Sequence, residues 1–313
     1  MIKKCPGCGS ILQYKDSSKV GYSPKKDAKL CERCFKLKNY NQKKIINLKY
    51  NNDEIIKLIN SEAHNVLFIT DFLNLSQKVI DVYNKIEVKN KILVINKADY
   101  IPKSINKDKY VNWIKDTYLV NDKVILVSAE KDYNMRLINN IISDNGKTYI
   151  CGFTNSGKSS IINKLSHINN KTTNILTSLM PNTTLDTIKV KLDEDKYIFD
   201  TPGFTIEDDF DENLFPKNYL KPVTLQLKDN DLILINNKYY LKVNNANSFT
   251  FYMSDKIEIK KIYEKEINLN NIVKIDENSD LVINNYGFIN IKNSCTIITN
   301  IKKEKYELRK SMF

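Results

Sequence analysis

The sequence CGFTNSGKSS at residues 151–160 fits the pattern G-x-x-x-x-G-K-[ST] and lies between an apolar segment and a helical one, which predicts a phosphate-binding loop. Gly152 and Gly157 would let backbone N–H groups curl around phosphate oxygens. Lys158 would place a positive charge on the terminal phosphates, and Ser159 would offer its hydroxyl group to magnesium. A chance glycine-rich turn is the alternative, and the strand before it and the helix after it argue against that. The predicted nucleotide contacts in this loop also include Asn155, Ser156 and Ser160.

The stretch YIFDTPGF at residues 197–204 supplies the next groups that such a phosphate site needs. Asp200, at the end of an apolar run, is expected to hold the water shell of the metal ion, and Gly203 is expected to donate its backbone N–H to a γ-phosphate. Between the two motifs, the segment MPNTTLDTI contains Thr184. We predict that Thr184 is the switch threonine, which reaches magnesium when a γ-phosphate is present.

Two further motifs predict that the base is guanine. In KILVINKADY, the amide of Asn96 can bond the O6/N7 edge of guanine, and the carboxylate of Asp99 can accept from N1–H and the exocyclic amine. Adenine offers no such pair of donors. Lys97 can lay its aliphatic stem over the base. In LVSAE, after another apolar strand, Ser128 and Ala129 match a loop that caps the base edge.

The order of these motifs is base, base, phosphate, switch, switch, whereas the phosphate loop usually comes first. Apolar runs such as NVLFITDF and KVILVSAE alternate with helical patterns such as SQKVIDVYNKI, which predicts a doubly wound α/β domain over residues 49–212. Strand pairing holds such a sheet, so its chain ends can be joined and a loop opened elsewhere. The sequence therefore predicts a circularly permuted P-loop domain with a mostly parallel sheet.

Residues 213–313 have a different pattern, with short alternating runs such as KYYLKV and SFTFYMS broken by Asn, Asp and Gly. This pattern predicts a small β-rich domain. Since the second switch precedes it directly, a switch movement would pass to it along the chain. The chain has no apolar run near the roughly 18 residues of a membrane helix, and its start lacks the apolar core of a secretory signal. We therefore expect no membrane insertion and a cytoplasmic location.

Residues 1–48 carry little periodicity, so something other than an apolar core must hold them. Four of the six cysteines form two C-x2-C pairs there: Cys5, Cys8, Cys31 and Cys34. Four thiolates in this spacing suit a tetrahedral structural zinc ion. Disulfides are disfavoured in a reducing cytoplasm, and a redox pair lacks the βα context that it needs. Cys151 and Cys295 lie in apolar runs and are expected to be ordinary buried residues.

The net charge of +12 is concentrated near the start of the chain. Residues 1–50 hold 13 Lys and Arg against 3 Asp and Glu, which a coding bias towards lysine would not explain, since it would act along the whole chain. If zinc replaces an apolar core in this region, its lysines are left to face a polyanion.

The motifs together resemble one family, the YqeH-type circularly permuted GTPases implicated in assembly of the small ribosomal subunit. CPGCGS and CERCFKLKNYN resemble its zinc module, and NKAD, SAE, GFTNSGKSS, PNTTLD and DTPGF resemble its motifs in their order. The resemblance implies a GTPase with an apolar residue, Phe204, where Ras-like enzymes carry a water-orienting glutamine, and a potassium ion bound by Asn155. The chain departs from the family at Asn182, where glycine is usual, and in its shorter C-terminal region.

The leading prediction is a GTP-hydrolysing factor that binds ribosomal RNA and small-subunit precursors, with GTP/GDP, magnesium and zinc as ligands. The alternative is a GTPase whose zinc module and β-rich domain bind a protein or a membrane surface, and a zinc protein acting on DNA is a third interpretation. Salt-dependent capture of pre-ribosomal particles would separate the first two. With two histidines in the chain, His64 and His167, histidine-based catalysis is not expected.

Overall fold

The computed structural model describes residues 3, 5, 11–15, 21–32, 35, 51–142, 147–169, 177–179, 187–193, 196–206, 214, 222–263, 267 and 269–313. Spatial contacts divide the chain into two compact units. Unit 1 comprises Met1–Ile69, Lys85–Ile92 and Asp132–Thr205, and unit 2 comprises Thr70–Asn84, Leu93–Lys131 and Ile206–Phe313. The domain boundaries that we predict after residues 48 and 212 stay predictions.

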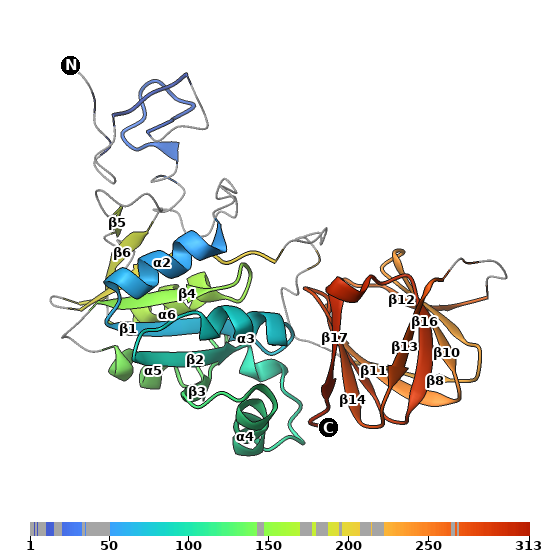
Figure 1. Cartoon of the computed structure of the whole chain (residues 1–313). Helices are drawn as coiled ribbons and strands as arrows, with labels where there is room; N and C mark the ends of the chain where they lie inside the picture. Colours follow the sequence, from blue (N-terminus) through green and yellow to red (C-terminus); the bar gives the residue numbers. More distant parts are fainter. Residues whose placement is uncertain are drawn as a thin grey trace. The chain divides into compact units, whose positions relative to one another are not determined.

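The predicted nucleotide motifs follow strands of one seven-stranded sheet, whose order is β3-β2-β1-β4-β7-β6-β5 (Figure 1). The strand bounds are β1 Asn65–Asp71, β2 Asn90–Asn96, β3 Lys123–Leu126, β4 Thr148–Gly152, β5 Thr177–Leu179, β6 Ile188–Lys191 and β7 Tyr197–Asp200. β4 pairs in parallel with β1 and with β7, whereas β5, β6 and β7 pair antiparallel. β1 and β4 are buried almost throughout, as expected of parallel strands covered on both faces.

Two of the helices between these strands begin after asparagines that cap them. Their bounds are α2 Asn52–Glu62, α3 Gln77–Asn84, η1 Ala98–Tyr100, α4 Lys107–Tyr118, α5 Met135–Ile141 and α6 Lys158–Ile168. The Asn51 side chain caps α2 by accepting from Asp53 N–H, and Asn106 caps α4 in the same way. Within the described ranges, no helix is long and apolar enough to cross a membrane.

The strand order agrees with the predicted permutation. β4, which leads into the phosphate loop, is the middle strand of the sheet and the fourth in the chain, whereas the strand before the phosphate loop usually comes first. The strands before the two base motifs lie on one side of it, and the strands around the switch motifs lie on the other. The fold is therefore a doubly wound P-loop domain. Its first strand in the chain is one that would follow the second switch in the usual order, as the motif order predicts.

The C-terminal region is β-rich, as predicted, and forms two five-stranded sheets with the orders β12-β9-β10-β16-β13 and β17-β14-β15-β11-β8 (Figure 1). The strands are β8 Val223–Leu227, β9 Leu232–Ile235, β10 Tyr239–Asn244, β11 Asn247–Met253, β12 Ile259–Ile262, β13 Asn271–Ile275, β14 Ser279–Ile283, β15 Gly287–Ile291, β16 Cys295–Thr299 and β17 Tyr306–Lys310, with η3 at Lys303–Lys305. Asn236 and Asn237 both have positive φ (50° and 52°), which suits the tight turn between β9 and β10.

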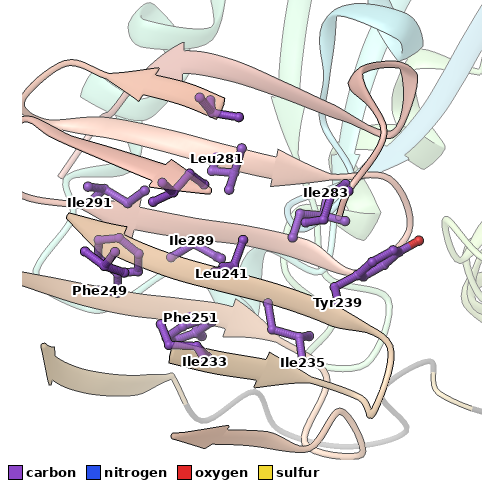
Figure 2. Packing of buried hydrophobic residues seen from close by; sticks show 14 of the residues in the cluster. Ile233, Ile235, Tyr239, Leu241, Phe249, Phe251, Leu281, Ile283, Ile289 and Ile291 are labelled. Carbon is purple, nitrogen blue, oxygen red and sulfur yellow. The ribbon is translucent and has the colours of Figure 1, made fainter. Parts of the chain in front are cut away.

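Alternate residues of these strands point into a shared apolar core (Figure 2). Along β10, buried and half-buried residues alternate strictly, which is the period of a strand with one covered face. Phe249, Phe251, Leu281 and Ile289 belong to the same buried cluster as Leu241 (Figure 2). The β-rich region therefore has a hydrophobic core of its own.

Within unit 2, the side chain of Arg309 in β17 is buried and contacts several partners at once. Its Nε lies 3.1 Å from Oδ2 of Asp280, which is also fully buried. Its Nη1 donates to the carbonyl of Leu75 at 2.7 Å and to the hydroxyl of Tyr118 at 3.0 Å. Its guanidinium group lies 5.1 Å from the ring centroid of Trp113. The planar fork of an arginine is needed to reach all of these partners at once.

Candidate guanine nucleotide site

The predicted phosphate loop turns between the end of β4 and the start of α6. A side chain at Gly152 would meet the carbonyl oxygen of Ile69 at 2.1 Å, so only glycine fits this close approach. Gly157 and Asn155 have left-handed backbones, with φ of 87° and 63°, which glycine and asparagine tolerate best. Of the predicted contact residues, Ser156 is buried and three are exposed: Asn155, Ser159 and Ser160.

Lys158, the first residue of α6, is paired with the carboxylate of Asp200. The same ammonium group donates to the carbonyl of Thr201 at 2.5 Å. Both side chains of the ion pair are largely buried, at 12% and 7% exposure. The structure therefore brings together the lysine of the phosphate loop and the aspartate of the second switch, 42 residues apart in the chain.

The segment after β7 runs along the phosphate loop. Phe204 N–H donates to the carbonyl of Gly152 at 3.0 Å, and Thr154 N–H donates to the carbonyl of Phe204 at 2.9 Å. A Cβ at Gly203 would meet Thr154 Cγ2 at 2.9 Å, so this glycine also permits a close approach. The Phe204 ring is fully buried and stacks on Phe68, with 5.7 Å between ring centroids. Its side chain belongs to the core, which leaves it unable to orient a water molecule.

The two base motifs are joined by the side chain of Asn96. Asn96 ends β2 and is buried, and its Oδ1 accepts from Ala129 N–H at 3.4 Å. Ser128 is also buried, and its Oγ accepts from Lys131 N–H at 3.0 Å, which closes the turn that carries Ala129. Asp99 lies in η1 and is half-buried. The Asn96 amide and the Ala129 backbone thus lie side by side, as the predicted guanine site requires.

Asp71 is a residue that the motifs did not identify. It ends β1, is buried, and lies 2.9 Å from the ammonium group of Lys97. Its Oδ1 also accepts from the backbone N–H groups of Leu73 and Asn74, at 2.9 and 3.1 Å. Asp71 therefore fixes both the loop after β1 and the lysine of the base motif. The signal for it was an acidic residue at the end of the apolar run NVLFITD, where a buried charge needs a partner.

Comparison with known families identifies the chain. The family described as RsgA GTPase matches residues 40–208, which is more than half of the chain. The chain belongs to the RsgA GTPase family. A second family, described as 50S ribosome-binding GTPase, matches residues 147–285. As an RsgA-family GTPase, the chain binds guanine nucleotides with magnesium and hydrolyses GTP.

Relatives of this RsgA-family GTPase include the protein named Uncharacterized protein YqeH from Bacillus subtilis (strain 168). The two are 31% identical over 250 residues, which cover 72% of this chain and 68% of that protein. The YqeH-type resemblance of the motifs is thereby confirmed.

Similar solved structures include YjeQ from Thermotoga maritima, at 22% identity and a TM-score of 0.33, with 45% of this chain and 48% of that chain covered. GNP-bound YlqF from Thermotoga maritima has 21% identity and a TM-score of 0.33, with 51% and 61% covered. The chain thus spans between about half and three-fifths of the length of these two structures.

Several predicted site residues of the RsgA-family GTPase lie outside the described residues: Thr184, Cys8 and Cys34. The other two predicted zinc ligands lie together, since Cys31 N–H donates to Cys5 Sγ at 3.3 Å. Both cysteines are buried and pack with Leu12. N–H groups that point at sulfur suit a thiolate ligand, so this pair fits half of a zinc site. In the described part of the chain, no group of three or more potential ligands gathers.

The two cysteines in apolar strands are both buried. Cys151 in β4 is fully buried, and desolvation raises the pKa of its thiol well above the usual range. Burial also raises the pKa of Cys295. Both stay protonated at neutral pH, which suits packing and not nucleophilic chemistry.

Proposed function

We propose that this GTPase is a ribosome assembly factor that binds ribosomal RNA in precursors of the small subunit, and that its nucleotide state controls this binding. The observation that carries the proposal is the position of the switch segment. Residues 200–205 are bonded to the phosphate loop and its lysine, and the chain continues from there towards the β-rich region. Loss or gain of the γ-phosphate would therefore move the switch segment and, through it, the β-rich region that follows in the chain.

The Lys158–Asp200 pair is the proposed sensor of the phosphates. A triphosphate carries more negative charge than one carboxylate, so it can replace Asp200 as the partner of Lys158. Asp200 is then released to hold the water shell of the metal ion. Magnesium, when bound, neutralises charge on the β- and γ-phosphates, and Ser159 and Thr184 are proposed to hold it. Because only GTP has a γ-phosphate, only GTP would engage the N–H of Gly203.

Base selection is proposed to rest on Asn96, Asp99 and the loop that carries Ala129. The Asn96 amide is already fixed by its bond from Ala129 N–H, so little side-chain freedom is lost when guanine binds. Asp99 accepts from the two guanine donors. Lys97, held by Asp71, covers the base with its aliphatic stem.

The partner is proposed to be RNA because the chain gathers positive charge at one end. Ten of the twelve net positive charges fall in residues 1–50, next to the cysteine pairs. A zinc ion bound by Cys5, Cys8, Cys31 and Cys34 would fold this region without an apolar core, and its lysines would then contact phosphates. The description of the second matching family, a 50S ribosome-binding GTPase, also supports a ribosomal partner.

Co-sedimentation with ribosomal particles tests the proposal. Tagged protein is mixed with a cell extract in GDP or a non-hydrolysable GTP analogue, and gradient fractions are probed for the protein. We expect it in small-subunit precursor fractions with the GTP analogue and near the top of the gradient with GDP. Lys158→Ala should stay near the top with both nucleotides. Association with large-subunit particles would redirect the proposal to that subunit, and association with no particle would favour a protein or membrane partner.

The salt dependence of RNA binding gives a second test. Each phosphate contact on a single strand contributes a slope of roughly −0.7 to log affinity against log salt, because condensed counterions are released. Reversing the charges of Lys36 and Lys38 should flatten the slope and leave GTP turnover unchanged. RNA affinity that does not vary with salt would contradict the proposed basic surface.

A further inference from the structure

The side chain of Asn52 forms a complete amide-to-peptide pair with Thr205. Its Nδ2 donates to the carbonyl of Thr205 at 2.9 Å, and its Oδ1 accepts from the N–H of Thr205 at 3.0 Å. The two residues are 153 positions apart in the chain. Such a two-way pair fixes both the position and the rotation of the Thr205 backbone, which a single hydrogen bond would not do.

Thr205 ends the switch segment that is bonded to the phosphate loop. It directly follows Phe204, whose backbone pairs with Gly152 and Thr154 and whose ring is packed in the core. Gly203, the proposed donor to the γ-phosphate, lies two positions before Thr205. The segment is thus held in the middle by the phosphate loop and at its end by Asn52.

Asn52 is the first residue of α2, the helix that leads into β1. In the usual motif order, the second switch would continue along the chain into this part of the sheet. Here the permutation separates the switch from α2, and the chain leaves Thr205 towards the β-rich region instead. The Asn52–Thr205 pair therefore links two segments that the usual motif order would join directly along the chain.

We propose that Asn52 is a positioning residue for GTP hydrolysis, which replaces the missing peptide connection and keeps Gly203 placed for the γ-phosphate. This inference rests on the proposed role of Gly203 and is independent of the ribosomal role. Without the pair, the backbone after Phe204 can rotate, and the share of molecules with a correctly placed Gly203 N–H falls. Two hydrogen bonds of ordinary net strength together change such an equilibrium about thirtyfold.

Two substitutions separate this role from helix stability. Asn52→Asp puts a carboxylate oxygen opposite the Thr205 carbonyl, so the bond to that carbonyl is lost and replaced by repulsion, while an acidic residue in the first turn favours the helix. Asn51→Ala is the matched control. It removes the cap of α2, whose side chain accepts from Asp53 N–H, and leaves Thr205 untouched. A purely structural role would make Asn51→Ala harmful and Asn52→Asp harmless.

The experiment uses the full chain and measures single-turnover GTP hydrolysis, the affinities for GDP and for a non-hydrolysable GTP analogue, and thermal melting. We expect Asn52→Ala to lower the hydrolysis rate and the analogue affinity about thirtyfold each, and Asn52→Asp to lower both as well, with GDP affinity unchanged. Asn51→Ala should lower the melting temperature and keep the preference for the analogue over GDP.

Wild-type hydrolysis and analogue affinity in both Asn52 variants would overturn the inference. An equal loss in Asn51→Ala would also overturn it, because the effect would then come from the helix. Gly203→Ala tests the underlying role, since its Cβ would press on Thr154. If Gly203→Ala keeps the wild-type preference for the analogue, the role of Gly203 fails and the role of Asn52 fails with it. If only Gly203→Ala is defective, Asn52 alone is excluded.

Discussion

The ammonium group of Lys97 lies 2.9 Å from Oδ2 of Asp71, and the two side chains are 17% and 1% exposed. Lys97 has a left-handed backbone, with φ of 59° and ψ of 36°, which lies just after the buried Asn96. Because the left-handed backbone and the ion pair both restrict Lys97, they fix the direction of its aliphatic stem. A residue outside the base motif thus holds a residue inside it.

Asp71→Asn should weaken guanine nucleotide binding and destabilise the fold. Removing one partner of a buried ion pair costs about 3–5 kcal/mol, and asparagine, which keeps an acceptor for the loop N–H groups, should fall near the lower end. GDP and GTP affinities should fall together, because the base is common to both. Urea unfolding and nucleotide titration check this. Asp53→Asn, which removes an exposed pair with Lys85 and one acidic residue from the first turn of α2, should change stability by less than about 1 kcal/mol.

Arg309→Met should be strongly destabilising, because it leaves the carboxylate of Asp280 buried without its cation. The expected loss in the free energy of unfolding is about 3–5 kcal/mol. Adding Asp280→Asn should recover part of that loss, since the buried charge is then gone as well. The matched control is Lys260→Met, whose partner Glu258 is 47% exposed, and which should have little effect. Equal effects of the two single variants would contradict the buried role of Arg309.

The fold could be predicted because its signals are local. Apolar runs such as NVLFITD and TYICG form strands that are buried on both faces, and Gly152 of the phosphate loop occupies a backbone position that only glycine fits. The permutation also follows from local signals, because each motif marks its own strand and their order along the chain is visible. The alternation of KYYLKV in β10 likewise predicts one covered face.

The contacts that hold the site were not predictable in this way. Asn52 and Thr205 carry no motif, and nothing in the sequence pairs residues 153 positions apart. Phe204 was visible as an apolar residue after Gly203, but its packing on Phe68 depends on how β1 and the switch segment meet. The pairing of Lys97 with Asp71 could not be predicted either, because it too depends on how distant segments meet. Local patterns specify the elements, whereas these partners depend on tertiary packing.

Asp99→Asn should change which base is bound. The carboxylate accepts from two guanine donors, and an amide in its place can donate to the C2 carbonyl of xanthine. We expect GTP affinity to fall and xanthosine triphosphate affinity to rise, with the phosphate contacts unaffected. A competition titration with both nucleotides checks this, and GTP affinity equal to that of the wild type would contradict the predicted base site.

Cys31→Ser combined with Cys34→Ser should release about one zinc ion per chain, because two ligands cannot hold a tetrahedral site. The region of residues 1–48 should then unfold, while GTP binding stays nearly intact. Elemental analysis and proteolysis of the purified chain check both points. Cys295→Ser is the matched control and should keep its zinc, since Cys295 lies in β16 of the β-rich region. Absence of zinc from the unmodified protein would exclude the site.

Potassium should accelerate GTP hydrolysis several-fold over sodium at constant ionic strength. Since the Phe204 side chain is packed in the core, it cannot orient water, and the family resemblance implies a potassium ion at Asn155 that would add to the charge stabilisation by Lys158 and magnesium. Asn155→Gly should abolish the difference between the cations. Glycine is the right replacement because Asn155 has φ of 63°, so the backbone is kept and only the amide is lost. Asn278→Gly, at another left-handed asparagine with φ of 52°, should keep the potassium response. A potassium response that survives in Asn155→Gly would remove Asn155 from the mechanism.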